Sequence, residues 1–214
     1  MTALQLIELN GLEVYLQPII SMRQEKIIAF EALTRVTPEY AGFLTLSELF
    51  LKAKRAREIV SLDQYVQKLA LEKFASYYKE DNSLLIFMNF EMDTIFSDNS
   101  LGFIEYAKTL GIPLENIVVE IKEDECLNNQ ILKDFIDNIS SLGVNVGIDD
   151  FGAECSSLHR LSVIRPSIIK IDIALISGIE NNFVNQEIVS SIVSMARHTQ
   201  IENAEKNNSF AENN

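Results

Sequence analysis

The sequence is poor in the residues on which several classes of site depend. Its 214 residues include two cysteines, two histidines and no tryptophan. Cys126 and Cys155 are too few for a disulfide framework and lack Cys-x-x-Cys spacing, which is typical of a reducing compartment and excludes structural zinc. His159 and His198 fall in helical stretches and are interpreted as surface or packing residues. Histidine-based catalysis is therefore not expected.

Long apolar runs and basic clusters are also missing. The longest obvious apolar stretch, Leu84–Met88, is far shorter than the ~20 residues that span a bilayer. The N-terminus has no secretion signal, so the cytoplasm is the expected location. With 18 Lys+Arg against 31 Asp+Glu the net charge is −13, whereas a phosphate-binding face needs clustered cations. We expect no membrane and no nucleic-acid polymer as partner, and a small anionic substrate only where a local cation attracts it.

The apolar pattern predicts one globular domain with alternating strands and helices. Two capping boxes, Thr45-x-x-Glu48 and Ser61-x-x-Gln64, predict helices that open near residues 46 and 62. Gly111 and Gly143 are expected to end helices that begin near residues 100 and 129. Six segments have strand length: Val14–Ile20, Ile27–Leu33, Leu84–Phe90, Ile117–Ile121, Val144–Asp150 and Ile168–Ala174.

The order of these segments predicts a barrel or an open sheet. From the third strand onward they recur at about 30 residues, the interval of βα units in a mostly parallel sheet. Only Ser21–Glu25 separates the first two strands, too short for a helical crossover, so strand one is expected to run antiparallel. A standard (β/α)₈ barrel takes about 250 residues. We therefore expect a barrel that is incomplete, followed by a disordered polar tail over 201–214.

Polar residues stand at the carboxyl ends of several predicted strands, where sites lie in α/β sheets and barrels. The adjacent pair Asp149-Asp150 would repel unless a cation or hydrogen-bond donors held it. An oxygen-only ligand set suits Mg²⁺ or Mn²⁺. With a lysine nearby, such a site suits phosphodiester hydrolysis. The candidates are Glu31, Asn89, Glu120, Asp149, Asp150, Lys170 and Asp172.

Five motifs in order make the chain similar to a known family. They are Tyr15-Leu-Gln17-Pro18-Ile, Glu31-Ala32-Leu33-Thr-Arg35, Glu120-Ile-Lys-Glu123, Asp149-Asp150-Phe-Gly152 with Ser156-Ser157-Leu158, and Lys170-Ile-Asp172. Together they resemble the EAL domain family, bacterial phosphodiesterases that linearise cyclic di-GMP on a modified TIM barrel whose first strand is antiparallel. The resemblance implies an EAL-type barrel over residues 1–200.

The resemblance also implies roles for individual residues. Glu31, Asn89, Glu120 and Asp149 resemble metal ligands, with Glu31 and Lys170 also counted as catalytic, and Asp150 resembles the acid that reaches a second Mg²⁺ or Mn²⁺. Lys170 resembles the lysine that positions the attacking water, and Glu123 the acid that steadies the loop after Asp149-Asp150. Gln17, Leu33 and Arg35 resemble substrate contacts, Arg35 as the partner of a phosphate.

The family pattern is incomplete at the C-terminal end. The family's seventh strand ends in Ala-Glu-Gly-Val-Glu and its eighth-strand region bears a glutamine, and neither is recognisable after Val184–His198, so strands 7 and 8 are expected to be missing. Three interpretations follow. The chain is a cyclic di-GMP phosphodiesterase, an inactive cyclic-di-GMP-binding or protein-interaction module, or a remnant whose open sheet edge is covered by a second copy as a homodimer.

Overall fold

The computed structural model describes residues 2–122, 130–152, 161–162 and 164–198. Six strands in these ranges form one sheet in chain order. They are β1 (Leu12–Ser21), β2 (Lys26–Val36), β3 (Leu85–Asn89), β4 (Ile117–Lys122), β5 (Asn145–Phe151) and β6 (Ile168–Ile171). Parallel registers join β2 to β3, β4 to β5 and β5 to β6. The six predicted strands are confirmed, and no end is displaced by more than three residues.

The first strand has the direction that the sequence predicts. β1 and β2 are neighbours in the sheet, and only residues 22–25 join them. A connection of this length makes a hairpin and not a crossover, so β1 runs antiparallel to β2.

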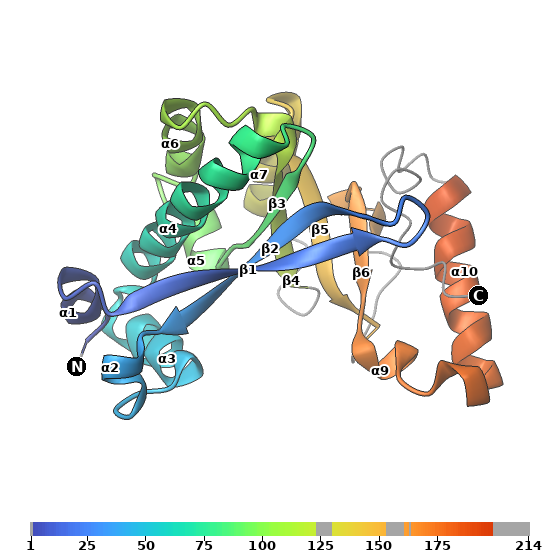
Figure 1. Ribbon diagram of the computed structural model, residues 1–214, viewed down its shortest axis with the longest axis horizontal. Coiled ribbons are helices and arrows are strands. Elements are labelled where there is room, and N and C mark those ends of the chain that lie inside the picture. Colours follow the sequence, from blue (N-terminus) through green and yellow to red (C-terminus); the bar gives the residue numbers. More distant parts are fainter. Residues whose placement is uncertain (1, 123–129, 153–160, 163, 199–214) are drawn as a thin grey trace. The chain divides into compact units, whose positions relative to one another are not determined.

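The chain divides into two compact units, Met1–Ile19 with Ala29–Ile117 and Ile20–Ile28 with Val118–Asn214. The helices of the first unit gather around the long helix α4, which contacts α1, α3, α5 and α6 (Figure 1). Its apolar core includes Leu6, Leu12, Leu49 and Leu62, each nearly inaccessible to solvent. These helices are α1 (Ala3–Glu8), α2 (Pro38–Ala41), α3 (Leu46–Ala56), α4 (Ile59–Glu80), α5 (Met92–Ile95) and α6 (Gly102–Thr109), with a 3₁₀ turn at Leu114–Asn116.

One predicted capping box is confirmed and the other is wrong. Thr45 and Glu48 exchange hydrogen bonds at the start of α3, as predicted. Ser61 caps nothing, because α4 begins earlier, at the buried Ile59. The carboxylate of Glu58 instead accepts a hydrogen bond from the backbone N–H of Ala3 at 3.0 Å. Packing of α1 against α4 therefore accompanies the earlier helix start.

Helix α1 was not predicted, although the sequence carries a signal for it. Thr2 and Gln5 form a capping box, in which the Thr2 side chain accepts from the Gln5 backbone and the Gln5 side chain accepts from the Thr2 backbone. This spacing is the usual helix-start pattern with glutamine at the third helical position. Only two α1 residues, Ala3 and Leu6, are buried, so the apolar period is too short to show in the sequence.

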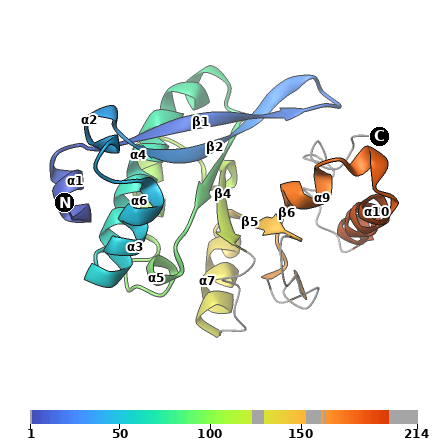
Figure 2. The same ribbon diagram turned by 90° about the horizontal axis from the view of Figure 1, so that it is seen from below.

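The second unit contains α7 (Gln130–Ser141), α9 (Ile173–Ile176), a 3₁₀ turn (Ile179–Asn181) and α10 (Phe183–His198). Helix α7 lies beside β5 and buries Leu132, Phe135 and Ile139 (Figure 2). Gly143, at φ +93°, follows the helix in a conformation that glycine adopts without strain. The predicted stop at Gly143 is thereby confirmed.

Strand β6 ends earlier than predicted. The Asp172 side chain accepts a hydrogen bond from the Ala174 backbone at 2.7 Å and so caps α9. The segment that the apolar pattern assigned to a strand through Ala174 therefore divides into β6 and α9. A short apolar run does not distinguish a strand from the first turn of a helix.

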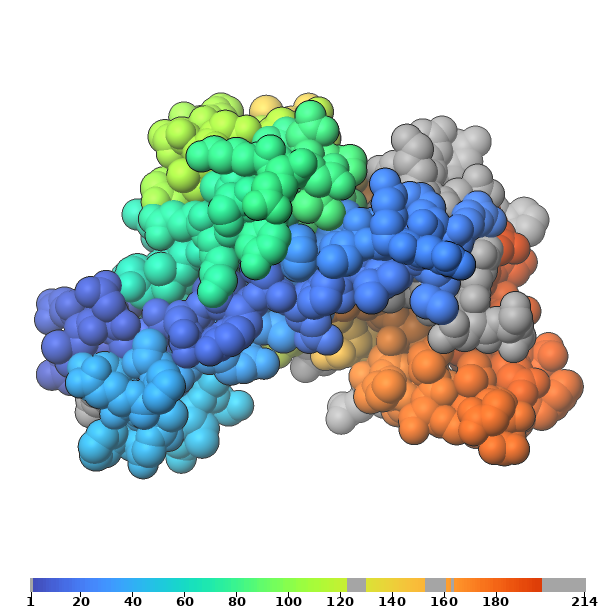
Figure 3. Space-filling view, in the orientation of Figure 1, coloured from blue at the N-terminus to red at the C-terminus, as the bar shows by residue number. Residues whose placement is uncertain are grey.

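The apolar residues of α10 are only partly buried. Val189 and Ile192 are 8% exposed, whereas Val184 is 63% and Ile188 is 40% exposed. The surface made by α9 and α10 is orange to red in Figure 3.

Among the described residues, no helix is both long and apolar enough to cross a membrane.

A carboxyl group is buried inside the first unit, on α4. Asp63 is 3% exposed, and its Oδ2 accepts hydrogen bonds from Gln67 Nε2 at 2.9 Å and from the backbone N–H of Glu91 at 3.3 Å. Burial raises the pKa of Asp63 to about 7, although the nearby Thr94 hydroxyl and these donors favour the charged form. The folded protein therefore binds a proton here that the unfolded chain releases near pH 4.

The raised pKa of Asp63 predicts a specific pH dependence of stability. The stabilisation from protonated Asp63 is fully present below about pH 4 and is lost as the pH rises to about 7. Between these two pH values the free energy of unfolding should fall by about 1.4 kcal/mol per pH unit. Asp63→Asn cannot ionise, so its free energy of unfolding, relative to the unsubstituted protein, should increase over this interval. Urea unfolding of both proteins at several pH values measures this, and parallel profiles would contradict the assignment.

Candidate metal centre

Three neighbouring strands of the second unit present polar side chains on one face. Gly147 of β5 pairs with Glu120 of β4 on one side and with Ile168 of β6 on the other. Alternate residues of a strand share a face. Asp149 and Lys170, two residues beyond Gly147 and Ile168, therefore lie on the face that carries Glu120.

The side chains on this face form a charged group. Lys170 Nζ lies 2.9 Å from Glu120 Oε1 and 3.1 Å from Asp149 Oδ1. The Glu120 side chain has no exposed surface, and those of Asp149 and Lys170 are 14% and 16% exposed. A charge removed from water needs a compensating charge. Lys170 supplies it to both acids.

Gly147 provides room for the Glu120 side chain. A Cβ atom at this position would lie 3.3 Å from Val118 Cγ1 and 3.5 Å from Glu120 Cγ. A side chain at this position would therefore be in close contact with Val118 and Glu120. The glycine in the strand segment Val-Gly-Ile is a signal in the sequence, because a glycine inside a strand marks a close approach of neighbouring atoms, but no role was predicted for it.

Asp150 leaves the regular alternation of β5. Its φ of +56° lies in the left-handed region, and the β5–β6 register is irregular between Ile148 and Phe151. Partial burial and the charges of Asp149 and Asp172 raise the pKa of Asp150, while Lys122 and Lys170 lower it. A β-bulge of this kind redirects a side chain next to a site.

The first unit carries the other predicted ligands. Glu31 of β2 pairs with Phe87 of β3, so Asn89, two residues beyond Phe87, shares a face with Glu31. Both are half-buried. Of the predicted substrate contacts, Leu33 is half-buried, whereas Gln17 and Arg35 are exposed. Arg35 Nη1 donates to the Thr34 carbonyl at 2.7 Å. Glu123 lies outside the described residues.

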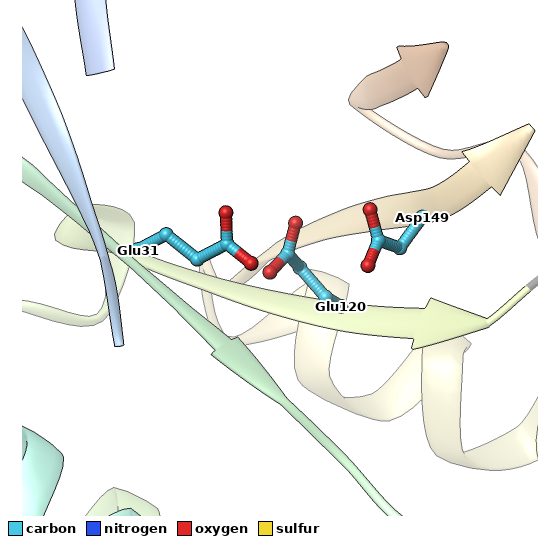
Figure 4. A group of neighbouring side chains, drawn as sticks. All are labelled: Glu31, Glu120 and Asp149. Atoms are coloured by element: carbon cyan, nitrogen blue, oxygen red, sulfur yellow. The ribbon is translucent and has the colours of Figure 1, made fainter. Parts of the chain in front are cut away.

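Three of the predicted ligands form a compact group of oxygens. Glu31, Glu120 and Asp149 each offer one carboxylate oxygen, and these oxygens lie within 4.8 Å of one another (Figure 4). A hard divalent cation binds oxygens at about 2.0–2.6 Å, so three oxygens at this spacing can share one ion. The donor set contains no nitrogen or sulfur, which suits Mg²⁺, Mn²⁺ or Ca²⁺. The residues present therefore fit a divalent metal.

Lys122 lies beside the site, although the sequence predicted no role for it. Its position is paired with Asp149 in the β4–β5 register, and its charge lowers the pKa of the neighbouring Asp150. Lys122 also follows Glu120 by two residues, which places both on one face of a strand. The two-residue spacing between Glu120 and Lys122 can be read from the sequence. The pairing of β4 with β5 and its register cannot.

Comparison with known proteins identifies a family. A family model described as the EAL domain matches residues 2–203. The EAL-domain protein YkuI of Bacillus subtilis (strain 168) is 27% identical over 188 residues, which are 86% of this chain and 45% of YkuI. The cyclic di-GMP phosphodiesterase PdeA of Borreliella burgdorferi is 26% identical over 184 residues, 85% of this chain and 28% of PdeA. The chain thus spans less than half the length of these relatives.

A solved structure agrees with the fold. The structure of Bacillus subtilis YkuI in complex with its substrate c-di-GMP and calcium is 25% identical, with a TM-score of 0.75, and the match covers 93% of this chain and 50% of that one. The six-stranded sheet with its helices is accordingly a modified TIM barrel, incomplete in the part of the chain that the structure describes.

The burial of Glu120 predicts a large effect of removing Lys170. In the presence of EDTA, Lys170→Met should lower the free energy of unfolding by roughly 3 kcal/mol, because the buried carboxylate loses its compensating ammonium. Lys108→Met is the matched control. Lys108 is 2.8 Å from Glu105 on the surface, where a pair contributes less than about 1 kcal/mol. If urea unfolding shows equal losses of unfolding free energy for Lys170→Met and Lys108→Met, the proposed importance of Lys170 is contradicted.

Proposed function

Because the chain belongs to the EAL domain family, we propose that it binds cyclic di-GMP and, with a divalent metal, hydrolyses it to the linear dinucleotide pGpG. The observation that carries this proposal is the group of three carboxylate oxygens from Glu31, Glu120 and Asp149, with Lys170 beside two of them. The matching relatives include a protein named as a cyclic di-GMP phosphodiesterase.

The metal-binding residues are proposed as follows. Glu31, Asn89, Glu120 and Asp149 would hold the first ion, Mg²⁺ or Mn²⁺, and Asp150 would contribute to a second. Bound metal would lower the pKa of a water molecule and neutralise charge on the phosphoryl oxygens. In support, all these donors are oxygens, and the bulge at Asp150 turns that side chain out of the strand's alternation.

Lys170 is proposed to hold the attacking water through its ammonium group, which Glu120 and Asp149 fix in place. The water oxygen forms a bond to one phosphorus atom as the bond from that phosphorus to the ribose 3′ oxygen breaks. The 3′ oxygen takes up a proton and the attacking water gives one up. The product carries a 5′ phosphate and a free 3′ hydroxyl.

Substrate recognition is proposed for Gln17, Leu33 and Arg35. Arg35 is exposed, so its guanidinium is accessible to a phosphate, with which it forms paired charge-assisted hydrogen bonds. A chain of net charge −13 repels an anionic ligand at long range. Local cations, Arg35 and Lys122 among them, are therefore needed for binding. Glu123 is proposed to steady the loop after Asp150.

A second candidate function is binding without hydrolysis. It is favoured by the sequence after Ala204-Glu205, where Lys-Asn-Asn stands in place of Gly-Val-Glu. Such a chain would respond to cyclic di-GMP as a regulatory module. In either case we propose a cytoplasmic protein, on the basis of its two cysteines without paired spacing. Pairing with a second copy is proposed as the means of covering the open sheet edge.

One incubation with cyclic di-GMP and a divalent metal distinguishes hydrolysis from binding without hydrolysis. Cyclic di-GMP with Mg²⁺ or Mn²⁺ should yield pGpG, and EDTA should stop the reaction, because the phosphoryl charge is then left without a metal. Product is measured by chromatography. Binding with Ca²⁺ but no product with Mg²⁺ or Mn²⁺ would support the binding module, and the lack of both would overturn both functions.

Glu31 tests the proposed ligand set. Glu31→Ala should reduce metal-dependent hydrolysis to background, because one of the three clustered oxygens is removed. The control is Glu13→Ala, since Glu13 is a partly exposed glutamate on the adjacent strand β1 that accepts a hydrogen bond from Tyr15. Circular dichroism confirms folding of both variants. Hydrolysis retained by Glu31→Ala would refute the site.

A further inference from the structure

The proposed mechanism leaves one buried ionisable group without a role. In the described residues only two carboxylates, those of Asp63 and Glu120, belong to buried residues. Glu120 is at the metal centre, whereas Asp63 is on α4 among the helices of the first unit. An unbonded carboxylate costs several kcal/mol to bury. The hydrogen bonds of Asp63 therefore indicate which part of the structure it holds in place.

The hydrogen bonds of Asp63 reach the segment that follows β3. Its Oδ2 accepts from the backbone N–H of Glu91, which is two residues beyond the candidate ligand Asn89. Gln67 Nε2 donates to the same oxygen at 2.9 Å from the next turn of α4. Gln67 is 3% exposed, and this bond fixes the carboxylate that receives Glu91.

Other contacts fix the same segment from other sides. Lys54 Nζ of α3 lies 2.7 Å from Glu91 Oε2. The Glu91 carbonyl accepts from the backbone of Thr94 at 2.9 Å and so begins α5. Phe90 is 4% exposed and meets the Phe103 ring edge-on, with 5.1 Å between the ring centroids. The three residues from Asn89 to Glu91 therefore have little freedom.

We propose that Asp63 is a positioning residue, which holds the Glu91 backbone and thereby sets the orientation of the Asn89 amide for metal binding. This inference rests on the proposed function, because it requires Asn89 to be a ligand. Asn89 closes a strand and is half-buried, so its side chain direction depends on the backbone on both sides. β3 fixes one side and the Asp63–Glu91 bond fixes the other.

Hydrogen bonds that orient metal ligands affect metal affinity as well as structure. Their loss commonly weakens metal affinity by 10- to 100-fold. A residue that only packs a helix would lower thermal stability and leave the affinity of the folded protein unchanged. Mn²⁺ affinity measured well below the melting temperature therefore distinguishes a positioning role from a purely structural one.

The test titrates the full chain with Mn²⁺ alone and follows free Mn²⁺ by electron paramagnetic resonance. Asp63→Ala should weaken binding by roughly tenfold or more. Asp63→Asn keeps an acceptor oxygen for Glu91 and should restore the affinity to within about threefold of the unsubstituted chain. Gln64→Ala is the matched control, because the Gln64 side chain, also on α4, donates to the Asn99 carbonyl at 3.1 Å. It should leave Mn²⁺ affinity unchanged.

A double-mutant cycle tests whether Asp63 acts through Asn89. In an Asn89→Ala background, Asp63→Ala should cause little further loss of affinity, because the ligand that it positions is gone. Losses that multiply would overturn the inference, and so would an unchanged affinity in Asp63→Ala. Failure of the unsubstituted chain to bind Mn²⁺ would overturn the proposed function and the inference together.

A second variant keeps the inference testable if Asp63→Ala does not fold. The Lys54 side chain is 41% exposed, so Lys54→Met is expected to fold. It removes the ion pair of the Glu91 side chain and should weaken Mn²⁺ binding by a smaller factor, about twofold to fivefold. Gln67→Met removes the donor that fixes the Asp63 carboxylate and should also weaken Mn²⁺ binding. Unchanged affinity in both Lys54→Met and Gln67→Met would overturn the inference.

Discussion

The candidate site depends on compensation of one buried negative charge. Glu120 has no exposed side-chain surface, and its position in the middle of the sheet gives water no access to its carboxylate. A cation must therefore be close whenever this carboxylate is charged. Lys170 provides one cation, with its Nζ 2.9 Å from Glu120 Oε1. A divalent ion bound by the clustered oxygens of Glu31, Glu120 and Asp149 would provide a second.

Sheet register converts distant sequence positions into this arrangement. Glu120 and Asp149 are 29 residues apart, and the parallel β4–β5 pairing places them on one face because Gly147 is opposite Glu120. A shift of one residue would turn Asp149 to the other face. The glycine also leaves space for the glutamate side chain. Strand pairing and the absence of one side chain thus form the site together.

Sequence patterns predicted the strands well because each is a short apolar run with a clear end, at a turn or at a helix. They were less accurate where tertiary contacts compete with local signals. Ser61 has a capping-box spacing, yet α4 begins at Ile59 against α1. Asp172 looked like part of a strand, yet it caps α9. No role was predicted for Asp63, because neither its burial nor its bond to Glu91 can be read from its neighbours in the sequence.

The sequence by itself determined the class of chemistry: oxygen donors and a lysine at strand ends, with too few histidines and cysteines for another metal site. It also determined the six strand segments and the antiparallel first strand, since connection length limits how two strands can pair. Only the tertiary structure decided which acids are buried, which cation lies between Glu120 and Asp149, and which helix holds the segment after Asn89. Burial and charge compensation depend on neighbours in space, and residues far apart in the chain become neighbours only when it folds.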